Sequence, residues 1–511
     1  MKNYGKVYFH GLCIHFPGNI FLYNPVCPSF EHPILFIFLT FTSEPNRRII
    51  RYKYQRGSRM NKEKSKNRGL MTEGVIWKEI LLFSIPLLLG NLFQQLYNTA
   101  DSLIVGNFLG SNALAAVSSS GNLIFLMVGF FNGIAIGAGV VIARYFGARD
   151  IDNMQRAIHT TVAFGLVSSL VLTVLGVLLA PQILIWMDTP ANVLPQSVTY
   201  FRIYFMGSLG LVMYNIFVGI LQAVGDSRHP LNYLIISSII NIVLDIVLIV
   251  VFHMGVGSAA FATILSQFVS AFLCMNRLLR TKDSYRLSLR KIRFHKDMLA
   301  LIIRYGLPSG LQNSIIAIAN VVVQSNINGF GEMAMAGCGA YSKIEGFAFL
   351  PITSFTMALT TFVGQNLGAR QYERTKKGAK FGMLCSMAIA EVIGIVIFLG
   401  APLLTAAFNN DPQVVMFGTE RARPSAMFFF LLAYSHCISA ILRGAGKSMV
   451  PMIVMLLFWC VVRVTFLTVM IHFLNDIAVV YWVYPLTWSL SSIAFFLYYR
   501  KVNWMHAFEA A

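Results

Sequence analysis

The stretch from Leu231 to Phe252, LNYLIISSIINIVLDIVLIVVF, holds a single charged residue, Asp245. A helix needs about 20 apolar residues to cross the hydrocarbon core of a bilayer. The strands of a membrane barrel would alternate polar and apolar side chains, and this stretch does not alternate. It therefore predicts a transmembrane helix, in which every backbone polar group is satisfied internally.

The composition extends this prediction to the whole chain. Hydrophobic residues make up 56% of the 511 residues and charged residues only 12%, and the mean hydropathy is +0.66. These values exclude an ordinary soluble protein. We expect an all-α integral membrane protein with six transmembrane helices in each half. The twelve expected spans are approximately residues 79–105, 113–143, 155–180, 197–223, 230–252, 256–279, 299–327, 334–363, 379–403, 414–442, 449–471 and 478–499.

The chain also repeats itself, with a constant offset of 221 in the numbering. The Gly-Ala-Arg block at 147–149 recurs at 368–370, and equivalent positions from 110 to 230 need no gap. Upstream, the offset between Pro86 and Pro308 is 222, which requires one gap. Duplicated halves of this kind are typical of membrane transporters whose two bundles rock around a shared site. The repeat predicts two pseudo-symmetric six-helix bundles around a central cavity.

Basic residues set the expected orientation and the domain boundaries. They gather in the connections after even-numbered spans, whereas the odd-numbered connections carry almost none. This positive-inside pattern places both termini in the cytoplasm and the protein in the plasma membrane. Together with the basic residues of the N-terminus, it accounts for most of the formal charge of +19, so we expect no nucleic-acid partner. The expected parts are residues 1–70, a disordered or mis-annotated extension; 71–280, the first lobe; 281–298, a basic cytoplasmic linker; 299–500, the second lobe; and 501–511, a cytoplasmic tail.

The extension carries heavy charge after its short apolar patch, which is the wrong order for a signal peptide. We expect natural translation to begin at Met60 or Met71. The basic linker is compatible both with a simple connection and with contact to anionic lipids.

Ionisable residues inside predicted spans are functional candidates, because a charge at the bilayer centre costs at least about 2.5–3.5 kcal/mol. The first half offers Asp101 on span 1 and Asp245 on span 5. Asn241 lies four residues before Asp245 and shares its helical face, and Thr263 lies on span 6 at a similar depth. These groups could hold a proton or a cation. The alternative is that each lies close enough to the outer loops to be hydrated.

The repeat strengthens the functional interpretation. The positions equivalent to Asp101 and Asp245 are Val322, or Val323 with another gap placement, and Phe466. A pair of acids needed for folding would be expected in both halves, so the asymmetry favours a coupling site in the first half. The second half has other candidates for buried charge: Lys343, Glu345, Glu391, His436 and Arg463. For Lys343 and Glu345 a structural ion pair with another span is as good an explanation as substrate contact. Glu391 could instead face a neighbouring serine or the lipid.

Several stretches resemble the multidrug and toxic compound extrusion (MATE) family. They are Pro86 to Val117 (PLLLGNLFQQLYNTADSLIVGNFLGSNALAAV), the two Gly-Ala-Arg blocks, Asn241-Ile-Val-Leu-Asp245, Ser342-Lys-Ile-Glu345, Pro351 and Gly364-Gln365-Asn366. The resemblance covers about residues 71–500. It implies two six-helix lobes around a cavity, and export of organic cations and amphiphilic drugs in exchange for H⁺ or Na⁺.

The resemblance also assigns residues by position. The family's helix-1 aspartate falls on Asp101, its helix-5 asparagine and aspartate on Asn241 and Asp245, and its helix-6 threonine on Thr263. Asn215 on span 4 is expected to join them. One branch of the family uses a glutamate on helix 7, but span 7 here has no carboxylate, which favours proton coupling in the first lobe and leaves Na⁺ open. The expected substrate-cavity residues are Gln95, Asn98, Met213, Phe217, Lys343 and Glu345.

Two alternatives remain at this point. A lipid-linked saccharide flippase would share the architecture but is expected to have a more cationic cavity. A membrane enzyme is disfavoured because no metal-ligand motif accompanies the acids. Residues 443–448, RGAGKS, lack the first glycine of a phosphate loop. We therefore expect a monomeric transporter, not an enzyme. It is expected to need no metal or other cofactor beyond the coupling ion. Its expected partners are lipophilic cations and the lipid bilayer.

Overall fold

The structure is a computed structural model that describes residues 8–9, 12–13, 70–187 and 189–506. The chain divides into two compact units, residues 1–67 and residues 68–511. In the first unit, β1 (Tyr8–Phe9) pairs antiparallel with β2 (Leu12–Cys13). Most of the predicted N-terminal extension, the candidate start Met60 and the last five residues of the predicted tail lie outside the described residues.

The described part of the second unit is helical. In the first half of the repeat its elements are α2 (Ile76–Leu109), α3 (Ser111–Gly147), α4 (Ile151–Trp186), α5 (Leu194–Met206), α6 (Ser208–Ala223), α7 (Arg228–Asp245), the π-helix η1 (Ile246–Val251) and α8 (Gly257–Arg280). In the second half they are η2 (Leu289–Lys291), α9 (Lys296–Asn328), α10 (Glu332–Gly368), α11 (Tyr372–Ala406), α12 (Pro412–Ala426), α13 (Phe429–Gly444), α14 (Met449–Met455), the π-helix η3 (Leu456–Val462), α15 (Arg463–Leu474) and α16 (Ala478–Lys501).

Among the described residues, ten helices are long and apolar enough to cross a membrane. Two further spans are bent pairs, α5 with α6 and α12 with α13, which brings the number to twelve. The all-α, twelve-span fold predicted from the sequence is therefore confirmed. The apolar side chains that remain exposed on these helices, such as Leu178 and Leu403, belong on a surface that faces lipid.

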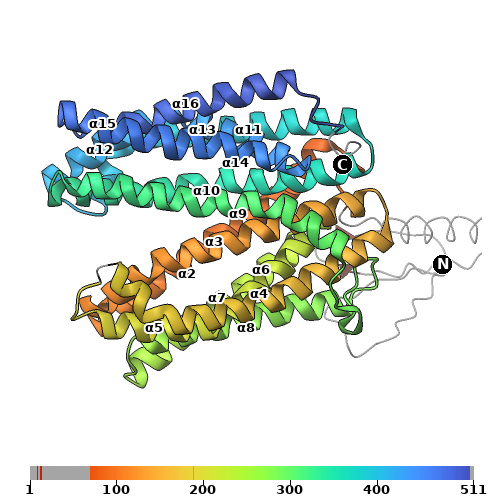
Figure 1. Ribbon diagram of the computed structural model, residues 1–511, viewed down its shortest axis with the longest axis horizontal. Coiled ribbons are helices and arrows are strands. Elements are labelled where there is room, and N and C mark those ends of the chain that lie inside the picture. Colours follow the sequence, from red (N-terminus) through yellow and green to blue (C-terminus); the bar gives the residue numbers. More distant parts are fainter. Residues whose placement is uncertain (1–7, 10–11, 14–69, 188, 507–511) are drawn as a thin grey trace, which may run out of the picture. The chain divides into compact units, whose positions relative to one another are not determined.

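The duplication is visible in the positions where helices begin. Five pairs of equivalent helices start at positions whose numbers differ by 221: Ser111 and Glu332, Ile151 and Tyr372, Ser208 and Phe429, Arg228 and Met449, and Gly257 and Ala478. Figure 1 shows α4 to α8 gathered in one bundle and α11 to α16 in a second. The offset found in the sequence therefore corresponds to a repeated structural unit.

The bends of the fourth and tenth spans lie at equivalent points. α5 and α6 meet at Gly207 with an angle of 50°, and α12 and α13 meet with an angle of 55°. A Cβ atom on Gly207 would collide with Ile264 of α8, so only glycine fits this bend. At the second bend, the carboxylate of Glu391 on α11 accepts a hydrogen bond of 3.2 Å from the backbone N–H of Phe430, a donor that the interrupted helix leaves free.

The two halves pack together at the end of the bundle that carries the Gly-Ala-Arg turns, called here the GAR end. α3 crosses α9 in direct backbone contact, because a Cβ atom on Gly133 would overlap Gly310 and one on Gly137 would overlap Gly306. The turns contact each other as well, since a Cβ atom on Gly147 would overlap Gln365. Glycine at these positions lets the helices approach closely enough to seal the GAR end.

The segment before α2 also bridges the halves at the GAR end. Arg374 of α11 donates hydrogen bonds to the backbone carbonyls of Met71, Glu73 and Gly74, at distances from 2.7 to 3.2 Å. The backbone N–H of Met71 donates to Gln365 Oε1 at 2.8 Å. The start of the first span is therefore held by the second half of the chain.

The basic linker between the halves packs back onto α4. The backbone N–H of Ser288 donates to His159 Nε2 at 3.2 Å, and that of His295 donates to Thr160 Oγ1 at 3.2 Å. Gln155 donates to two carbonyls of the linker, those of Ser284 and Arg286. These contacts fix the linker to the first half instead of leaving it as a free tether.

Candidate ion site and central cavity

The first half holds a pair of carboxylates, of which Asp245 is buried and Asp101 half-buried. Asp101 lies on α2 and Asp245 is the last residue of α7, two helices that pack against each other. The two carboxyl groups lie close enough to interact directly. The Asp245 side chain is fully buried, and neither of its oxygens accepts a hydrogen bond from a described residue. A carboxylate pair without a fixed cation can be neutralised by a mobile proton or metal cation.

The other residues predicted for this site differ in how free they are to bind an ion. Asn241 lies one turn before Asp245, is buried, and has no hydrogen-bond partner for either carboxamide atom among the described residues. Thr263 donates its hydroxyl hydrogen to the carbonyl of Ala259 in its own helix, at 3.0 Å. Asn241 is therefore the freer of the two, while Thr263 offers only its oxygen lone pairs.

Three tyrosines that the sequence does not single out lie near the acid pair: Tyr97 and Tyr200 are buried and Tyr204 is half-buried. Tyr97, Tyr200 and Tyr204 all lie within electrostatic range of Asp101. Tyr97 comes one helical turn before Asp101, so the i to i+4 spacing could have indicated it. Tyr200 and Tyr204 stack with ring centroids 6.2 Å apart. These rings add apolar surface and hydroxyl groups to the surroundings of the carboxylates.

A second and much larger feature is a cavity of about 840 Å³ between the two halves. The first half contributes polar, uncharged side chains to its wall, mainly the carboxamides of Asn91, Gln94, Asn132, Asn215, Gln222 and Gln267. Neither Asp101 nor Asp245 lines the cavity. The acid pair therefore lies beside the cavity, inside the first half, and does not form part of the described cavity wall.

All the charged groups in the described wall come from the second half. They are Glu345, Arg421, Arg443 and Arg463, accompanied by His436. Three arginines against one glutamate make this wall electropositive. A cationic cavity is the feature expected above for the flippase alternative.

Two of the arginines are held by aromatic rings. The guanidinium carbon of Arg421 lies 5.4 Å from the Tyr341 ring centroid and 5.5 Å from that of Tyr484. Arg463 lies 4.5 Å from the same Tyr484 ring and 5.3 Å from Trp459. The one ring of Tyr484 is thus shared by both guanidinium groups. Arg463 is among the candidates predicted from the sequence, whereas Arg421 is not; Arg421 is buried in α12, whose apolar character is weak.

The structure separates the predicted substrate-cavity residues. Glu345 lines the cavity, whereas Gln95, Asn98 and Lys343 are not part of its lining. Met213 and Phe217 are buried in the hydrophobic core of the first half. The reason is helix rotation: residues 211, 214, 215, 218 and 222 of α6 face the cavity at helical spacing, so positions 213 and 217 face away. On α2, Gln94 takes the place expected for Gln95.

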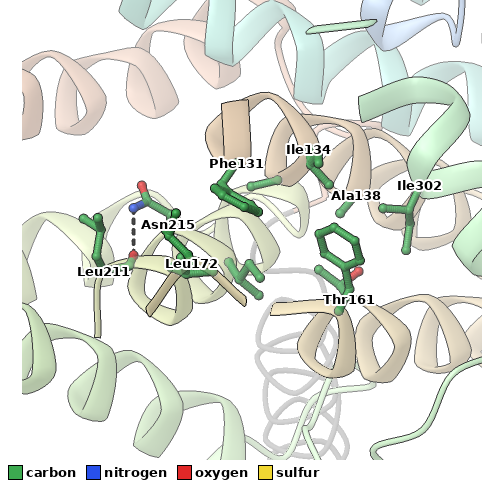
Figure 2. A pocket seen from close by; sticks show the side chains of 12 residues that line it. Phe131, Ile134, Ala138, Thr161, Leu172, Leu211, Asn215 and Ile302 are labelled. Atoms are coloured by element: carbon green, nitrogen blue, oxygen red, sulfur yellow. Dashed lines mark hydrogen bonds between the residues drawn. The ribbon is translucent and has the colours of Figure 1, made fainter. Parts of the chain in front are cut away.

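Asn215 also borders a small separate pocket of about 20 Å³, which is lined by the first half and by Ile302 of α9. Figure 2 shows it at the edge of this pocket, donating to the carbonyl of Leu211 at 2.8 Å. The rest of the lining is apolar apart from Thr161. A pocket of this size holds about one water molecule, so the larger cavity is the candidate substrate site.

Comparison with known proteins places the chain among transporters. The MatE family profile matches residues 86–247 and again residues 308–469. The chain is similar to the probable multidrug resistance protein YoeA of Bacillus subtilis, with 28% identity over 84% of this chain and 94% of that protein. It is also similar to the probable multidrug resistance protein NorM of Thermotoga maritima, with 26% identity over 74% of this chain and 82% of that protein.

Solved structures give the same result. A MOP superfamily transporter from Pyrococcus furiosus, described as having a binding pocket of reverse polarity that suggests a different function, matches with a TM-score of 0.81 and 25% identity. That match covers 86% of this chain and 98% of the other. A multidrug resistance MATE family transporter described in an outward-facing conformation matches with a TM-score of 0.81 and 25% identity, over 87% of this chain and 99% of that one.

Proposed function

Because the chain belongs to the MATE family of multidrug efflux transporters, we propose that it is a secondary exporter of amphiphilic small molecules, driven by H⁺ entering at the Asp101–Asp245 pair. Na⁺ at the same carboxylates is the alternative coupling ion. The observation that carries this proposal is the acid pair, with Asp245 fully buried, beside but outside a cavity large enough for a drug-sized molecule.

The separation of the two sites is what makes exchange possible. An ion and a substrate that bind at different places can each favour a different conformation, and their differential affinities then move the equilibrium between conformations. Asp245 lies directly before the π-helix η1. Since π segments interrupt the regular α-helical hydrogen bonds, neutralising Asp245 can change the shape of span 5 at low cost.

The proposed cycle is alternating access between two lobes. In this conformation the halves meet through the glycines of α3 and α9 at the GAR end. The positive-inside pattern of the connections assigns the GAR end to the cytoplasm. We therefore infer an outward-facing state of a plasma-membrane protein, which agrees with the similarity to a transporter described in that state.

One observation favours the flippase alternative. The described charges of the cavity wall are three arginines and one glutamate, and a lipid-linked saccharide carries phosphate groups that such a wall would attract. The match of both halves to the MatE profile favours the exporter. A solved relative with a pocket described as being of reverse polarity shows that this fold accommodates more than one charge pattern.

Transport by the full chain in proteoliposomes tests the proposal. A proton gradient or a sodium gradient is imposed separately, and the movement of fluorescent amphiphiles of either charge is followed. Asp101→Asn and Asp245→Asn should each reduce gradient-driven transport to the background of empty vesicles. Asp297→Asn is the matched control, because this exposed acid does not line the cavity. It forms an ion pair with Arg156, with 2.8 Å between Oδ1 and Nη2.

The result that contradicts coupling is clear-cut. If Asp101→Asn and Asp245→Asn both keep wild-type gradient-driven rates at equal abundance in the vesicles, the acid pair does not couple transport. A response to the sodium gradient alone would replace H⁺ by Na⁺ at the same pair.

A further inference from the structure

The charged wall of the second half is only partly neutralised by the protein itself. Glu345 lies within electrostatic range of both Arg421 and Arg463. Yet no ion pair in the part of the chain that the structure describes joins either arginine to a carboxylate within 4.0 Å. One carboxylate shared by two guanidinium groups leaves a net positive charge beside the cavity.

The hydrogen-bonding capacity of these arginines is also incompletely used. Both side chains are at least 96% buried, and the Nε atom of each lacks an acceptor among the described residues. Arg463 donates to Thr487 Oγ1 at 3.0 Å, and Arg421 makes only long contacts, of 3.4 Å to Cys338 O and 3.5 Å to the Tyr484 hydroxyl. Buried donors of this kind need a partner, and a guanidinium fork fits an oxyanion in a bidentate manner.

The aromatic rings set how such a partner would approach. Each guanidinium group lies over two rings: Tyr484 is shared by both, Tyr341 is the second ring for Arg421 and Trp459 the second ring for Arg463. A contact of this kind with a ring needs no N–H group, so the N–H edges that Thr487, Cys338 and Tyr484 do not use stay available to a ligand. Trp459, Trp488 and Phe349 also line the cavity and offer apolar surface beside these edges.

We propose that Arg421 and Arg463 bind the anionic group of the cargo, a carboxylate or phosphate on an amphiphile whose apolar body packs against Trp459, Trp488 and Phe349. This inference rests on the proposed exporter function and specifies its substrate class. It replaces the lipophilic cation expected from the family resemblance by an amphiphile of the opposite charge. Glu345 then competes with the anion for the same two guanidinium groups and weakens its hold, which allows release.

The test is equilibrium binding to the purified full chain in a neutral detergent. Two probes share one aromatic body, a pyrene with a butyrate group and a pyrene with a butyl-trimethylammonium group, and Trp459 and Trp488 report binding by fluorescence transfer to pyrene. We expect the carboxylate to bind at least about tenfold more tightly than the ammonium probe. Arg421→Gln and Arg463→Gln should each weaken carboxylate binding by about tenfold or more and leave ammonium binding unchanged or stronger.

Two further variants separate binding from folding. Arg423→Gln is the matched control, because Arg423 lies two residues further along α12 and stacks on Phe398 at 5.8 Å, but is exposed and does not line the cavity. It should leave the preference unchanged. Glu345→Gln should tighten carboxylate binding several-fold, whereas a purely structural ion pair would predict no gain. Because it adds net positive charge, this variant tests the idea even where Arg421→Gln fails to fold.

The outcomes distinguish this inference from the exporter function. Equal or tighter binding of the ammonium probe, or wild-type carboxylate binding by Arg421→Gln and Arg463→Gln, overturns the inference and leaves ion coupling untouched. If the wild-type chain binds the carboxylate probe but shows no gradient-driven transport, the exporter function alone is overturned. A short-chain phosphatidylglycerol that displaces the carboxylate, where phosphatidylcholine does not, would identify lipid as the source of the anion. Displacement by neither identifies a soluble amphiphile.

Discussion

The first half carries two carboxylates and a carboxamide at positions where the second half buries an arginine and two apolar side chains. Both halves share one scaffold, so the difference lies in the side chains that each half places on it. The equivalent residues, first half and then second, are Asp101 and Val323, Asn241 and Arg463, and Asp245 and Leu467.

This equivalence depends on where each half carries its π-helical segment. η3 precedes Arg463, whereas η1 follows Asp245. A π turn accommodates one extra residue. After the extra residue of η3, the difference in number between equivalent residues of the two halves therefore rises from 221 to 222. After the extra residue of η1 it returns to 221, as the starts of α8 and α16 show. The burial pattern from 241 to 246 is identical to that from 463 to 468. The sequence-based assignment of Phe466 as the equivalent of Asp245 is therefore wrong, and Leu467, fully buried like Asp245, takes that place.

The same comparison explains the wall of the cavity. Tyr200, beside the acid pair, corresponds to Arg421, and Thr263 corresponds to Tyr484, each with the common offset of the repeat. Within membrane helices, unpaired ionisable groups are costly and are kept where they serve function. The halves have thus diverged into complementary roles: the proposed ion site in the first and the proposed anion site in the second.

The largest effect should come from giving the first half the side chain of the second. Asp245→Leu copies Leu467 into the ion site and should abolish gradient-driven transport in proteoliposomes. Its free energy of unfolding should be unchanged or higher than that of the wild type, because the substitution removes an acid that no described residue hydrogen-bonds.

The reciprocal variant is the control for this experiment. Leu467→Asp places an acid in the second half and should cost stability without restoring transport to Asp245→Leu. Transport by Asp245→Leu at the wild-type rate would show that the difference between the halves has no role in coupling.

The fold and the acid pair could be predicted from the sequence because both follow from the free-energy cost of placing polar groups in lipid, which can be judged from a single stretch of chain. A run such as Leu231 to Phe252 leaves the backbone no alternative to a helix in lipid, and a carboxylate in such a run must be accounted for. The cavity wall could not be predicted so well. Whether Met213 or Asn215 faces the cavity depends on the rotation of α6, which its apolar neighbours on either side do not reveal. Arg421 was missed because a bent span hid how deeply it is buried.

A smaller effect should follow from separating the halves at the GAR end. Gly133→Ala places a Cβ atom against the backbone of Gly310, and the helices cannot yield there without losing contact. We expect a destabilisation of about 1–3 kcal/mol, typical of overpacked contacts, together with slower transport. Thermal unfolding and the proteoliposome assay measure both.

Gly339→Ala serves as the matched substitution, because its Cβ atom would meet nothing within 4 Å. It should be neutral or slightly stabilising. If Gly133→Ala behaved in the same way, direct backbone contact between α3 and α9 would not be what closes the GAR end.

A further effect concerns the start of α2, which belongs to the first half but is held by the second. Arg374→Ala removes the hydrogen bonds to the carbonyls of Met71, Glu73 and Gly74. Each such bond contributes a net of about 0.5–1.5 kcal/mol, and solvent replaces part of it, so we expect a loss of about 1–2 kcal/mol. Hydrogen exchange at residues 71–75 should accelerate. Arg374→Lys keeps the positive charge but loses the several N–H donors of the guanidinium group, so it should recover only part of the protection from hydrogen exchange. Wild-type protection in Arg374→Ala would show that these hydrogen bonds do not hold the start of α2.

The smallest effect should come from the two bends, which the halves stabilise by different means. The first half uses Gly207, whereas the second uses the Glu391 carboxylate to accept the N–H of Phe430. Glu391→Gln keeps an oxygen that can accept this bond, so its thermal stability should be close to that of the wild type. Glu391→Leu leaves the donor unsatisfied and should cost about 1 kcal/mol, with transport unchanged at equal abundance. A transport defect in Glu391→Gln without a change in stability would instead give this acid a part in the cycle, and the second half would then no longer be free of a coupling carboxylate.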